Sequence, residues 1–153
     1  MKILMVCLGN ICRSPIAEGI LRHKLRVMKN EDVQTDSAGT SNFHVGEQPD
    51  SRMRMTAVKN GMDISDLRAR QFVQSDFDEF DLIYAMDNAN KLDILKLARN
   101  DADRAKVKLI LDEIYPGENR EVPDPYYGGD EGFQQVFDML DDATDQLIAR
   151  YID

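Results

Sequence analysis

The first twenty residues, MKILMVCLGNICRSPIAEGI, constrain the fold of this chain more than any other stretch. The apolar, β-favouring run of residues 3–6 leads directly to Cys7, and a loop of five residues separates that thiol from Arg13. Ser14 and Pro15 then open a segment with the spacing of a helix. The sequence therefore predicts a strand, a tight loop and a helix in immediate succession.

The loop between Cys7 and Arg13 has the features of an anion-binding site. A short loop that ends at a helix N-terminus can turn several backbone N–H groups toward one point, where the helix dipole favours an oxyanion such as phosphate. Gly9 and Asn10 tolerate the left-handed backbone angles that such a loop requires, and the planar guanidinium of Arg13 can hold two phosphoryl oxygens. The expected phosphate-binding loop consists of Cys7, Leu8, Gly9, Asn10, Ile11, Cys12, Arg13 and Ser14.

Cys7 has the surroundings of a catalytic nucleophile, because the positive field of the loop and of Arg13 favours the reactive thiolate. Ser14 can either cap the helix that starts at Pro15 or donate a hydrogen bond to the Cys7 sulfur and stabilise it as a leaving group. A Cys and an Arg at this spacing also occur by chance, and the alternative is a buried strand-end thiol beside a solvated arginine. The strand before the pair and the Gly-Asn and Ser-Pro pairs around it favour the catalytic interpretation.

Strand and helix patterns alternate along the rest of the chain. The expected strands cover residues 3–6, 33–37, 81–86 and 107–111, and the expected helices cover residues 15–28, 49–60 and 131–151, with another helix after Asp87 that carries Leu92, Leu95 and Ala98. Ser75 and Asp87 are placed to cap the short turn and the helix that follow them. This alternation predicts an α/β fold, a three-layer sandwich in which helices flank a four-stranded parallel sheet, with the site at the carboxyl ends of the strands. We expect one domain, residues 1–153.

The charge and the cysteines argue against several classes of function. Lys and Arg number 19 against 28 Asp and Glu, and the net charge of -9 argues against nucleic acid or an anionic membrane as a partner. The apolar runs are shorter than a membrane span and the N-terminal run is shorter than a signal peptide, so we expect a cytoplasmic protein. Both cysteines lie in the one loop, and two cysteines with two histidines offer no zinc-binding spacing, so no metal site is expected.

A second candidate motif, Asp124-Pro125-Tyr126-Tyr127, lies in a long polar loop rich in proline and glycine, residues 112–130. Pro125 restricts Asp124 to an extended backbone, and a carboxylic acid over a phosphate site can protonate the leaving oxygen of an ester. Asp-Pro is also common in turns, so the motif alone indicates a turn residue, and only the cysteine loop favours an acid. Tyr126 and Tyr127 could line a cleft that suits a phenyl phosphate and is too deep for phosphoserine or phosphothreonine.

Two further residues have open interpretations. Phe43, the only large aromatic of the turn-rich loop 37–49, either forms a wall of the substrate slot or packs the loop onto the body of the protein. Cys12 either captures an oxidised Cys7 as a reversible, inactivating disulfide or is a small buried packing residue.

The segment VCLGNICRSP resembles the phosphate-binding loop of the low-molecular-weight protein tyrosine phosphatases. The resemblance extends over essentially the whole chain, because the Asp124 motif also lies where that family places it. It implies that Cys7 is the nucleophile, that Arg13 binds phosphate and that Asp124 is the general acid. Tyr126 and Tyr127 would then flank the cleft.

The same resemblance places Phe43 and His44 at the positions that govern substrate specificity, and Ser37 in support of the loop residue Asn10. The chain departs from a common family pattern at Leu67, where many members carry a histidine that helps to hold the loop asparagine. We therefore expect the rigidity of the loop to depend more on Ser37.

These features predict a protein tyrosine phosphatase that acts in two steps. In the first, Cys7 attacks phosphorus while the loop amides and Arg13 hold the equatorial oxygens, and Asp124 protonates the departing phenol. In the second, water activated by Asp124 releases phosphate while Ser14 stabilises the departing sulfur. No metal or organic cofactor is expected, and the substrate is a tyrosine-phosphorylated protein or a small aryl phosphate. The physiological substrate and the oligomeric state stay open.

Three other functions are less consistent with the sequence. An arsenate reductase can share this fold and loop, but its thioredoxin-linked chemistry needs further cysteines, and the chain has only Cys7 and Cys12. A non-catalytic phosphotyrosine-binding module has no use for Asp124. A nucleotide-binding domain would show a Walker loop or G-x-G-x-x-G after a strand, and neither is present.

Overall fold

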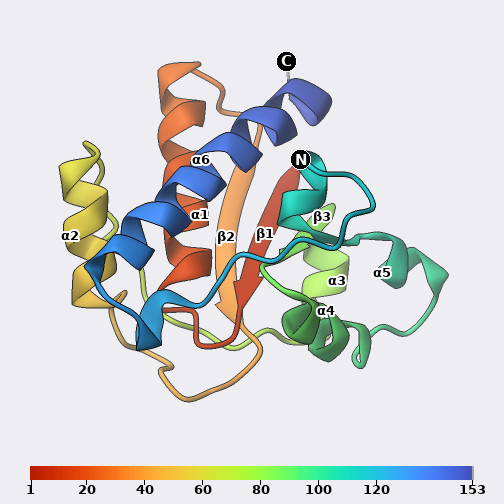
Figure 1. Ribbon diagram of the computed structural model, residues 1–153. Coiled ribbons are helices and arrows are strands. Elements are labelled where there is room, and N and C mark those ends of the chain that lie inside the picture. Colours follow the sequence, from red (N-terminus) through yellow and green to blue (C-terminus); the bar gives the residue numbers. More distant parts are fainter. Residues whose placement is uncertain (153) are drawn as a thin grey trace.

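The computed structural model describes residues 1–152, with the side chain of Tyr127 outside that description. Its centre is a four-stranded parallel sheet with the strand order β2-β1-β3-β4 (Figure 1). The strands are β1 (Lys2–Cys7), β2 (Gln34–Gly39), β3 (Leu82–Ala85) and β4 (Val107–Leu109). The predicted α/β class and the parallel sheet are confirmed.

Strand β1 is central and is buried on both faces. It pairs with β2 from Lys2↔Gln34 to Cys7↔Gly39, and with β3 from Ile3↔Leu82 to Val6↔Ala85. A strand covered on both faces must be apolar along its whole length rather than alternating, which explains the continuous run of residues 3–6, all fully buried. The pairing brings the residues that follow β1, β2 and β3 to one edge of the sheet.

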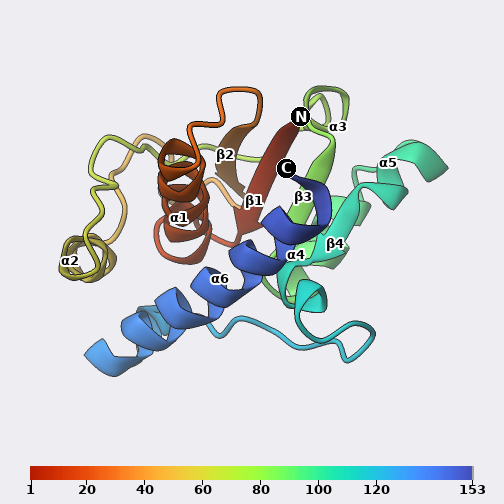
Figure 2. The same ribbon diagram turned by 90° about the horizontal axis from the view of Figure 1, so that it is seen from above.

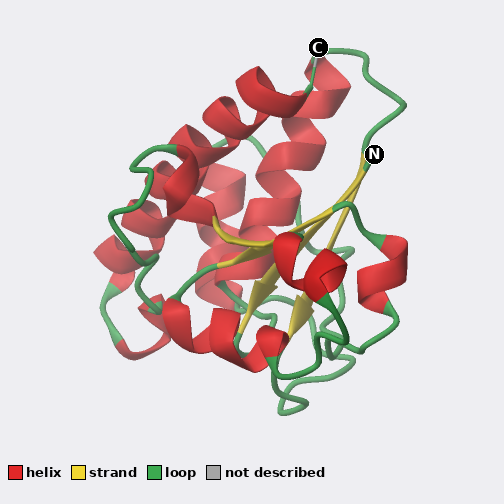
Figure 3. Cartoon of the chain, turned by 90° about the vertical axis from the view of Figure 1, so that its right-hand side faces the viewer, coloured by secondary structure: helices red, strands yellow, loops and turns green. Residues whose placement is uncertain are grey.

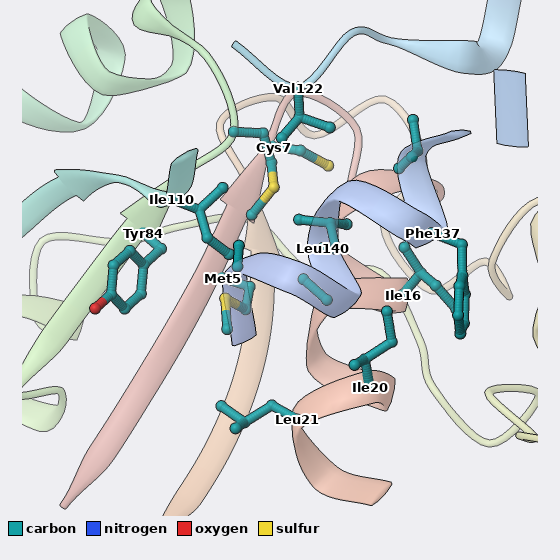
Figure 4. Packing of buried hydrophobic residues seen from close by; sticks show 14 of the residues in the cluster. Met5, Cys7, Ile16, Ile20, Leu21, Tyr84, Ile110, Val122, Phe137 and Leu140 are labelled. Atoms are coloured by element: carbon teal, nitrogen blue, oxygen red, sulfur yellow. The ribbon is translucent and has the colours of Figure 1, made fainter. Parts of the chain in front are cut away.

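Helices cover both faces of the sheet and make the expected three layers. One face carries α1 (Arg13–Val27), α6 (Asp130–Tyr151) and, beside them, α2 (Ser51–Lys59) (Figure 2). The apolar stripes of α1 and α6 meet the sheet residues of this face in one cluster, seen in Figure 4 around Met5 and Leu140. The other face is covered by α3 (Asp76–Glu79) and α4 (Asn88–Leu95), and Figure 3 shows the strands between the two groups of helices.

Several boundaries differ from the sequence-based expectation. Strand β2 extends two residues beyond the expected end at Ser37, through Gly39. The helix after Asp87 ends at Leu95, so Ala98 lies outside it. A short helix, α5 (Asp101–Ala105), follows and was not predicted, because its charged sequence has no apolar periodicity. Strand β4 stops at Leu109 and continues as the 3-10 helix η1 (Ile110–Glu113).

One of the two predicted caps is wrong. Asp87 caps α4, because its carboxylate accepts a hydrogen bond from the Asn90 N–H at 2.7 Å. Ser75 makes no capping bond with its side chain, since its own backbone is already helical. The Asp76 carboxylate stabilises that turn instead, accepting from the Val73 N–H at 2.9 Å.

Within residues 1–152, no helix combines the length and the apolar composition needed to cross a membrane.

Candidate active site

Cys7 lies at the carboxyl end of β1, at the start of the tight loop. Its Sγ accepts a hydrogen bond from the Asn10 N–H at 3.3 Å and lies 3.0 Å from the Ser14 Oγ. The end of β2 holds the loop from outside, where a Cβ on Gly39 would lie 2.8 Å from the Leu8 carbonyl oxygen. The glycine is therefore required by close backbone contact rather than by its own dihedral angles.

Ser14 does not cap helix α1. The helix begins at Arg13, so Ser14 is inside its first turn, and the N-cap position is occupied by Cys12 without a side-chain hydrogen bond. The Ser14 Oγ lies instead 3.0 Å from the Cys7 sulfur, within hydrogen-bond distance. Of the two roles considered for Ser14, the geometry is that of a hydrogen-bond partner for the thiol.

Asn10 connects the loop to three other parts of the chain. Its backbone is left-handed, with φ of 57°, and its side chain is buried. The Nδ2 group donates to the Ser14 Oγ at 2.8 Å and to the Ser37 Oγ at 2.9 Å, and the Oδ1 atom accepts from the Arg70 N–H at 2.9 Å. Leu67 makes none of these contacts; it packs against the core, and the backbone of Arg70 supplies the bond from that segment.

Arg13 is buried under the loop and is held by two acceptors. Its Nη1 donates to the Asp87 carboxylate at 2.7 Å and to the Val122 carbonyl at 3.0 Å. Burial opposes the charged form, but the interactions with Cys7, Asp87 and Asp124 outweigh it and raise the pKa of Arg13. The guanidinium is therefore a fixed cation beside the Cys7 sulfur.

Asp124 forms the turn considered for it and also lines the pocket that contains Cys7. Its Oδ1 accepts from the Tyr126 N–H at 3.0 Å, an Asx-type turn at the start of the 3-10 helix η2 (Pro125–Tyr127). Its Oδ2 lies 3.7 Å from the Arg13 Nη2, and the side chain lines the same pocket as Cys7. The turn thus fixes one carboxylate oxygen and leaves the other directed toward the site.

The loop, Asp124 and several aromatic residues line one pocket. Its floor and lower walls come from Cys7, Leu8, Gly9, Ile11, Cys12 and Arg13, and its rim from Phe43, His44, Asp124 and Tyr126. Asn10 and Ser14 are not among the lining residues; they hold the loop from behind. The pocket therefore has a floor that carries one cation, Arg13, and a rim that carries aromatic side chains.

The aromatic rim is built from two segments far apart in sequence. Phe43 is 73% exposed, which favours a wall of the pocket over a packing role. The His44 ring lies 6.4 Å from the Tyr126 ring, and its Nδ1 is 2.8 Å from the Glu47 Oε2. The expected partner of Tyr126, Tyr127, has a side chain outside the described part of the structure.

Cys12 is a buried free thiol, as is Cys7. Burial, followed by the negative charge of Asp50, raises the pKa of Cys12 strongly, although Arg52 acts in the opposite direction. Cys12 is therefore held as the protonated thiol.

Two residues of the site were missed by sequence reasoning. Asp87 was expected only as a helix cap, although it lies two residues after the end of β3, at the same edge of the sheet as the loop that follows β1. Glu18 was not considered; it is buried on α1, and its Oε1 accepts a hydrogen bond from the Ser37 Oγ at 2.7 Å. Burial raises the pKa of Glu18 to about 7. The sequence did contain a signal for Glu18, because it lies four residues after Ser14 on the face of the helix that is buried.

Among the residues that the structure describes, no cluster of three or more His, Cys, Asp or Glu side chains could hold a metal ion.

Comparison with known proteins points to one family. The sequence model described as low molecular weight phosphotyrosine protein phosphatase matches residues 2–152. A Synechocystis protein named as a low molecular weight protein-tyrosine-phosphatase is 48% identical over 149 residues, covering 97% of this chain and 94% of its own.

Solved structures agree with this match. A protein tyrosine phosphatase from Entamoeba histolytica superimposes with a TM-score of 0.91 at 43% identity, covering 98% of this chain and 96% of its own. An arginine phosphatase from Drosophila superimposes with a TM-score of 0.92 at 31% identity, covering 100% of this chain and 99% of its own.

Proposed function

The chain belongs to the low molecular weight phosphotyrosine protein phosphatase family and is a phosphoric monoester hydrolase, and from this premise we propose that it hydrolyses phosphotyrosine and small aryl phosphates through a phosphocysteine on Cys7. The observation that carries the proposal is the shared pocket of Cys7, Arg13 and Asp124, in which a nucleophile, a fixed cation and an acid surround one anion-sized space. That combination suits attack on a phosphate monoester better than simple binding.

In the first step, the Cys7 sulfur attacks phosphorus and the bond to the phenolic oxygen breaks. The loop amides and the Arg13 guanidinium take up the charge on the equatorial oxygens, a preorganised arrangement because both are held in place before substrate arrives. Asp124 donates its proton to the departing phenolic oxygen. The products are free phenol and a phosphocysteine.

In the second step, water attacks the phosphocysteine and releases inorganic phosphate. Asp124, now ionised, takes a proton from that water. The sulfur departs as a thiolate, and the Ser14 hydroxyl at 3.0 Å is placed to donate a hydrogen bond to it. Cys7 is again a thiolate and Asp124 is again protonated, so the cycle uses only water and residues of the chain.

The rim of the pocket supports an aryl ester as the substrate. Phe43 and Tyr126 offer apolar faces above the cationic floor, and a phenyl ring between them would bury more apolar surface than a short alkyl phosphate could. Because one structural relative is an arginine phosphatase, phosphoarginine is the relevant competing substrate. We expect phosphotyrosine to be preferred over phosphoarginine, phosphoserine and phosphothreonine in kcat/KM.

Two alternatives can be separated from this function by experiment. A non-catalytic phosphotyrosine-binding module would bind a phosphotyrosine peptide without releasing phosphate. An arsenate reductase would need a cysteine relay beyond Cys7 and Cys12, and the sequence has no further cysteine.

The deciding test is release of the phenol from an aryl phosphate at mildly acidic pH, with reductant and without metal. The wild type should turn over, Cys7→Ser should be inactive, and Asp124→Asn should be slowed by about a hundredfold or more. Glu118→Gln is the matched control, since this carboxylate lies in the same loop but pairs with Arg120 at the surface. An inert wild type that still binds a phosphotyrosine peptide would favour the binding module.

A cytoplasmic location and redox regulation stay predictions. For the second, we propose that mild peroxide converts Cys7 to a sulfenic acid, which condenses with the Cys12 thiol to a disulfide and water. The raised pKa of Cys12 makes the capture slow, because the thiolate is the reactive form. Mass spectrometry that shows only over-oxidised Cys7 would exclude the disulfide.

A further inference from the structure

Glu18 is a buried carboxyl group on helix α1. It lies on α1 with 6% of its surface exposed, and within residues 1–152 no Lys, Arg or His side chain forms an ion pair with it. Arg22, one turn further along the helix, is engaged in a double hydrogen bond with Asp66. Burying a carboxyl group in this way is unfavourable unless a specific contact compensates for it.

The contact that Glu18 makes leads to the nucleophile. Its Oε1 accepts from the Ser37 hydroxyl at 2.7 Å, and the oxygen of that hydroxyl accepts from the Asn10 amide at 2.9 Å. The second proton of the same amide is donated to the Ser14 Oγ at 2.8 Å, and the Ser14 Oγ lies 3.0 Å from the Cys7 sulfur. Four hydrogen bonds therefore connect Glu18 to Cys7.

We propose that Glu18 is a positioning residue for the phosphatase reaction, one that fixes the direction of the hydrogen bonds ending at the Cys7 sulfur. The inference rests on the proposed function and deepens it. Glu18 does not line the pocket and acts only through the residues between.

The direction of the bonds follows from counting protons. An ionised Glu18 can only accept, so the single hydroxyl proton of Ser37 points to it and the lone pairs of Ser37 face the Asn10 amide. The amide then donates to both serines, and the Ser14 proton is left for the Cys7 sulfur or for the more distant Ala38 carbonyl at 3.4 Å. The shorter contact is the one with the sulfur.

A protonated Glu18 weakens this order. Its carboxyl gains a proton that needs an acceptor, and the nearest hydrogen-bonding group is the Ser37 oxygen. If Ser37 accepts from Glu18, its own proton loses that acceptor and must turn elsewhere, so the Ser37 lone pairs no longer face the Asn10 amide in the same way. Fewer Ser14 hydroxyls then point to the sulfur, and the departure of sulfur in the second step is slowed.

Burial, together with the groups around Glu18, places its titration near neutrality. Burial is the main cause that raises its pKa to about 7, and the Ser37 bond lowers it. Weaker effects come from Asp36 on β2, Arg22 on the same helix and Asp66 in the loop after α2. Asp36 and Asp66 oppose ionisation, and Arg22 favours it. The ordered form of the hydrogen bonds should therefore become dominant as the pH rises through about 7.

The stability of the fold should decrease as the pH rises, whereas the order of the hydrogen bonds to Cys7 should increase. The pKa of Glu18 is raised in the folded state from 4.5 to about 7, so its contribution to folding is complete below pH 4.5 and is lost as the pH rises through about 7. The same ionisation that orders the bonds to Cys7 thus makes the protein less stable. A role confined to stability would not affect the rate in this way.

The test compares wild type with Glu18→Gln, which keeps the shape of the side chain but cannot ionise. We would measure kcat for an aryl phosphate at saturation and the Tm of the free protein between about pH 5.5 and 8, a range that brackets the raised pKa. The ratio of wild-type to variant kcat should rise with pH by about threefold, the size expected for the reorientation of one neutral hydrogen bond. The Tm of the wild type relative to the variant should fall over the same range.

Two further variants separate positioning from burial. Ser37→Ala keeps the carboxyl group of Glu18 but removes the bridge to Asn10. The ratio of wild-type kcat to Ser37→Ala kcat should therefore also rise with pH. If Glu18→Gln does not fold, this comparison alone tests the positioning role. Glu113→Gln is the matched control, because Glu113 is equally buried but pairs with Arg150. Its kcat ratio to wild type should be constant with pH.

Two outcomes overturn the inference in distinguishable ways. An active wild type whose kcat ratios to Glu18→Gln and Ser37→Ala do not change with pH removes the positioning role and leaves the phosphatase function intact. A wild type that does not hydrolyse the aryl phosphate at any pH removes both.

Discussion

The guanidinium of Arg13 lies 2.7 Å from the carboxylate of Asp87, from Nη1 to Oδ2. The other oxygen of Asp87 accepts from the Asn90 N–H and caps α4. One carboxylate therefore fixes both the start of a helix and the residue expected to bind phosphate. The contact exists because β1 and β3 are neighbours, so the residues just beyond their carboxyl ends meet.

Replacing Asp87 should separate these two roles. Asp87→Asn keeps a side chain that caps helices well but loses the ion pair, so Arg13 is held less firmly and inorganic phosphate should inhibit about tenfold more weakly. Asp87→Ala should also lose about 1 kcal/mol of folding stability with the cap. Competitive inhibition constants and denaturant unfolding measure the two effects. A wild-type inhibition constant in Asp87→Asn would show that Arg13 needs no such support.

The acid role of Asp124 makes a prediction about leaving groups. Asp124→Asn keeps the turn acceptor for the Tyr126 N–H but cannot donate a proton to the leaving oxygen. The loss in kcat/KM should be about a hundredfold or more for phenyl phosphate and much smaller for nitrophenyl phosphate, whose phenolate departs without help. An equal loss for both substrates would mean that Asp124 acts in some other way.

The close contact at Gly39 predicts a large effect from one methyl group. In Gly39→Ala the new Cβ would lie 2.8 Å from the Leu8 carbonyl oxygen and 3.1 Å from the Asn10 nitrogen, so the phosphate-binding loop must move. Because small misplacement of reacting groups is costly, we expect kcat/KM to fall by about a hundredfold. Gly129→Ala is the control, since among the described residues no atom beyond its two chain neighbours lies within 4 Å of its new Cβ. Wild-type activity in Gly39→Ala would contradict the close contact.

The two thiols should differ sharply in reactivity. Cys7 lies in the pocket beside the Arg13 cation, whereas burial and the charge of Asp50 raise the pKa of Cys12 and keep it protonated. Iodoacetate near pH 7 should label Cys7 first, by about tenfold or more, and inorganic phosphate should protect it. Peptide mass spectrometry gives both rates. Equal labelling, or labelling that phosphate does not slow, would argue against an anion site around Cys7.

The strand, loop and helix at the N-terminus were predictable because their signals are local. These signals are the apolar run of β1, the ability of Asn10 to adopt left-handed backbone angles, and the Ser-Pro pair. They lie within a few residues of one another. The parallel sheet was predictable for a related reason, since a strand covered on both faces must be apolar throughout.

The contacts made by Asp87 and Glu18 could not be predicted in the same way. Asp87 meets Arg13 only because β3 pairs with β1, and Glu18 meets Ser37 only because α1 packs on β2. The sequence could indicate that Glu18 is buried and that Asp87 follows a strand, but nothing near either residue identifies the partner that it meets. The wrong cap at Ser75 has the opposite origin: the residue type was suitable, but the backbone there is already helical.

The most direct test of the account is to trap the covalent intermediate. Ser14→Ala removes the hydroxyl 3.0 Å from the Cys7 sulfur and should slow release of phosphate more than formation of the phosphoenzyme, so the intermediate accumulates. This variant would be mixed with an aryl phosphate, quenched within the first turnover and digested for mass spectrometry. The account predicts one phosphoryl group, on Cys7, with a burst of phenol equal to the enzyme present. Phenol release without a phosphorylated Cys7, or a phosphoryl group on another residue, would contradict it.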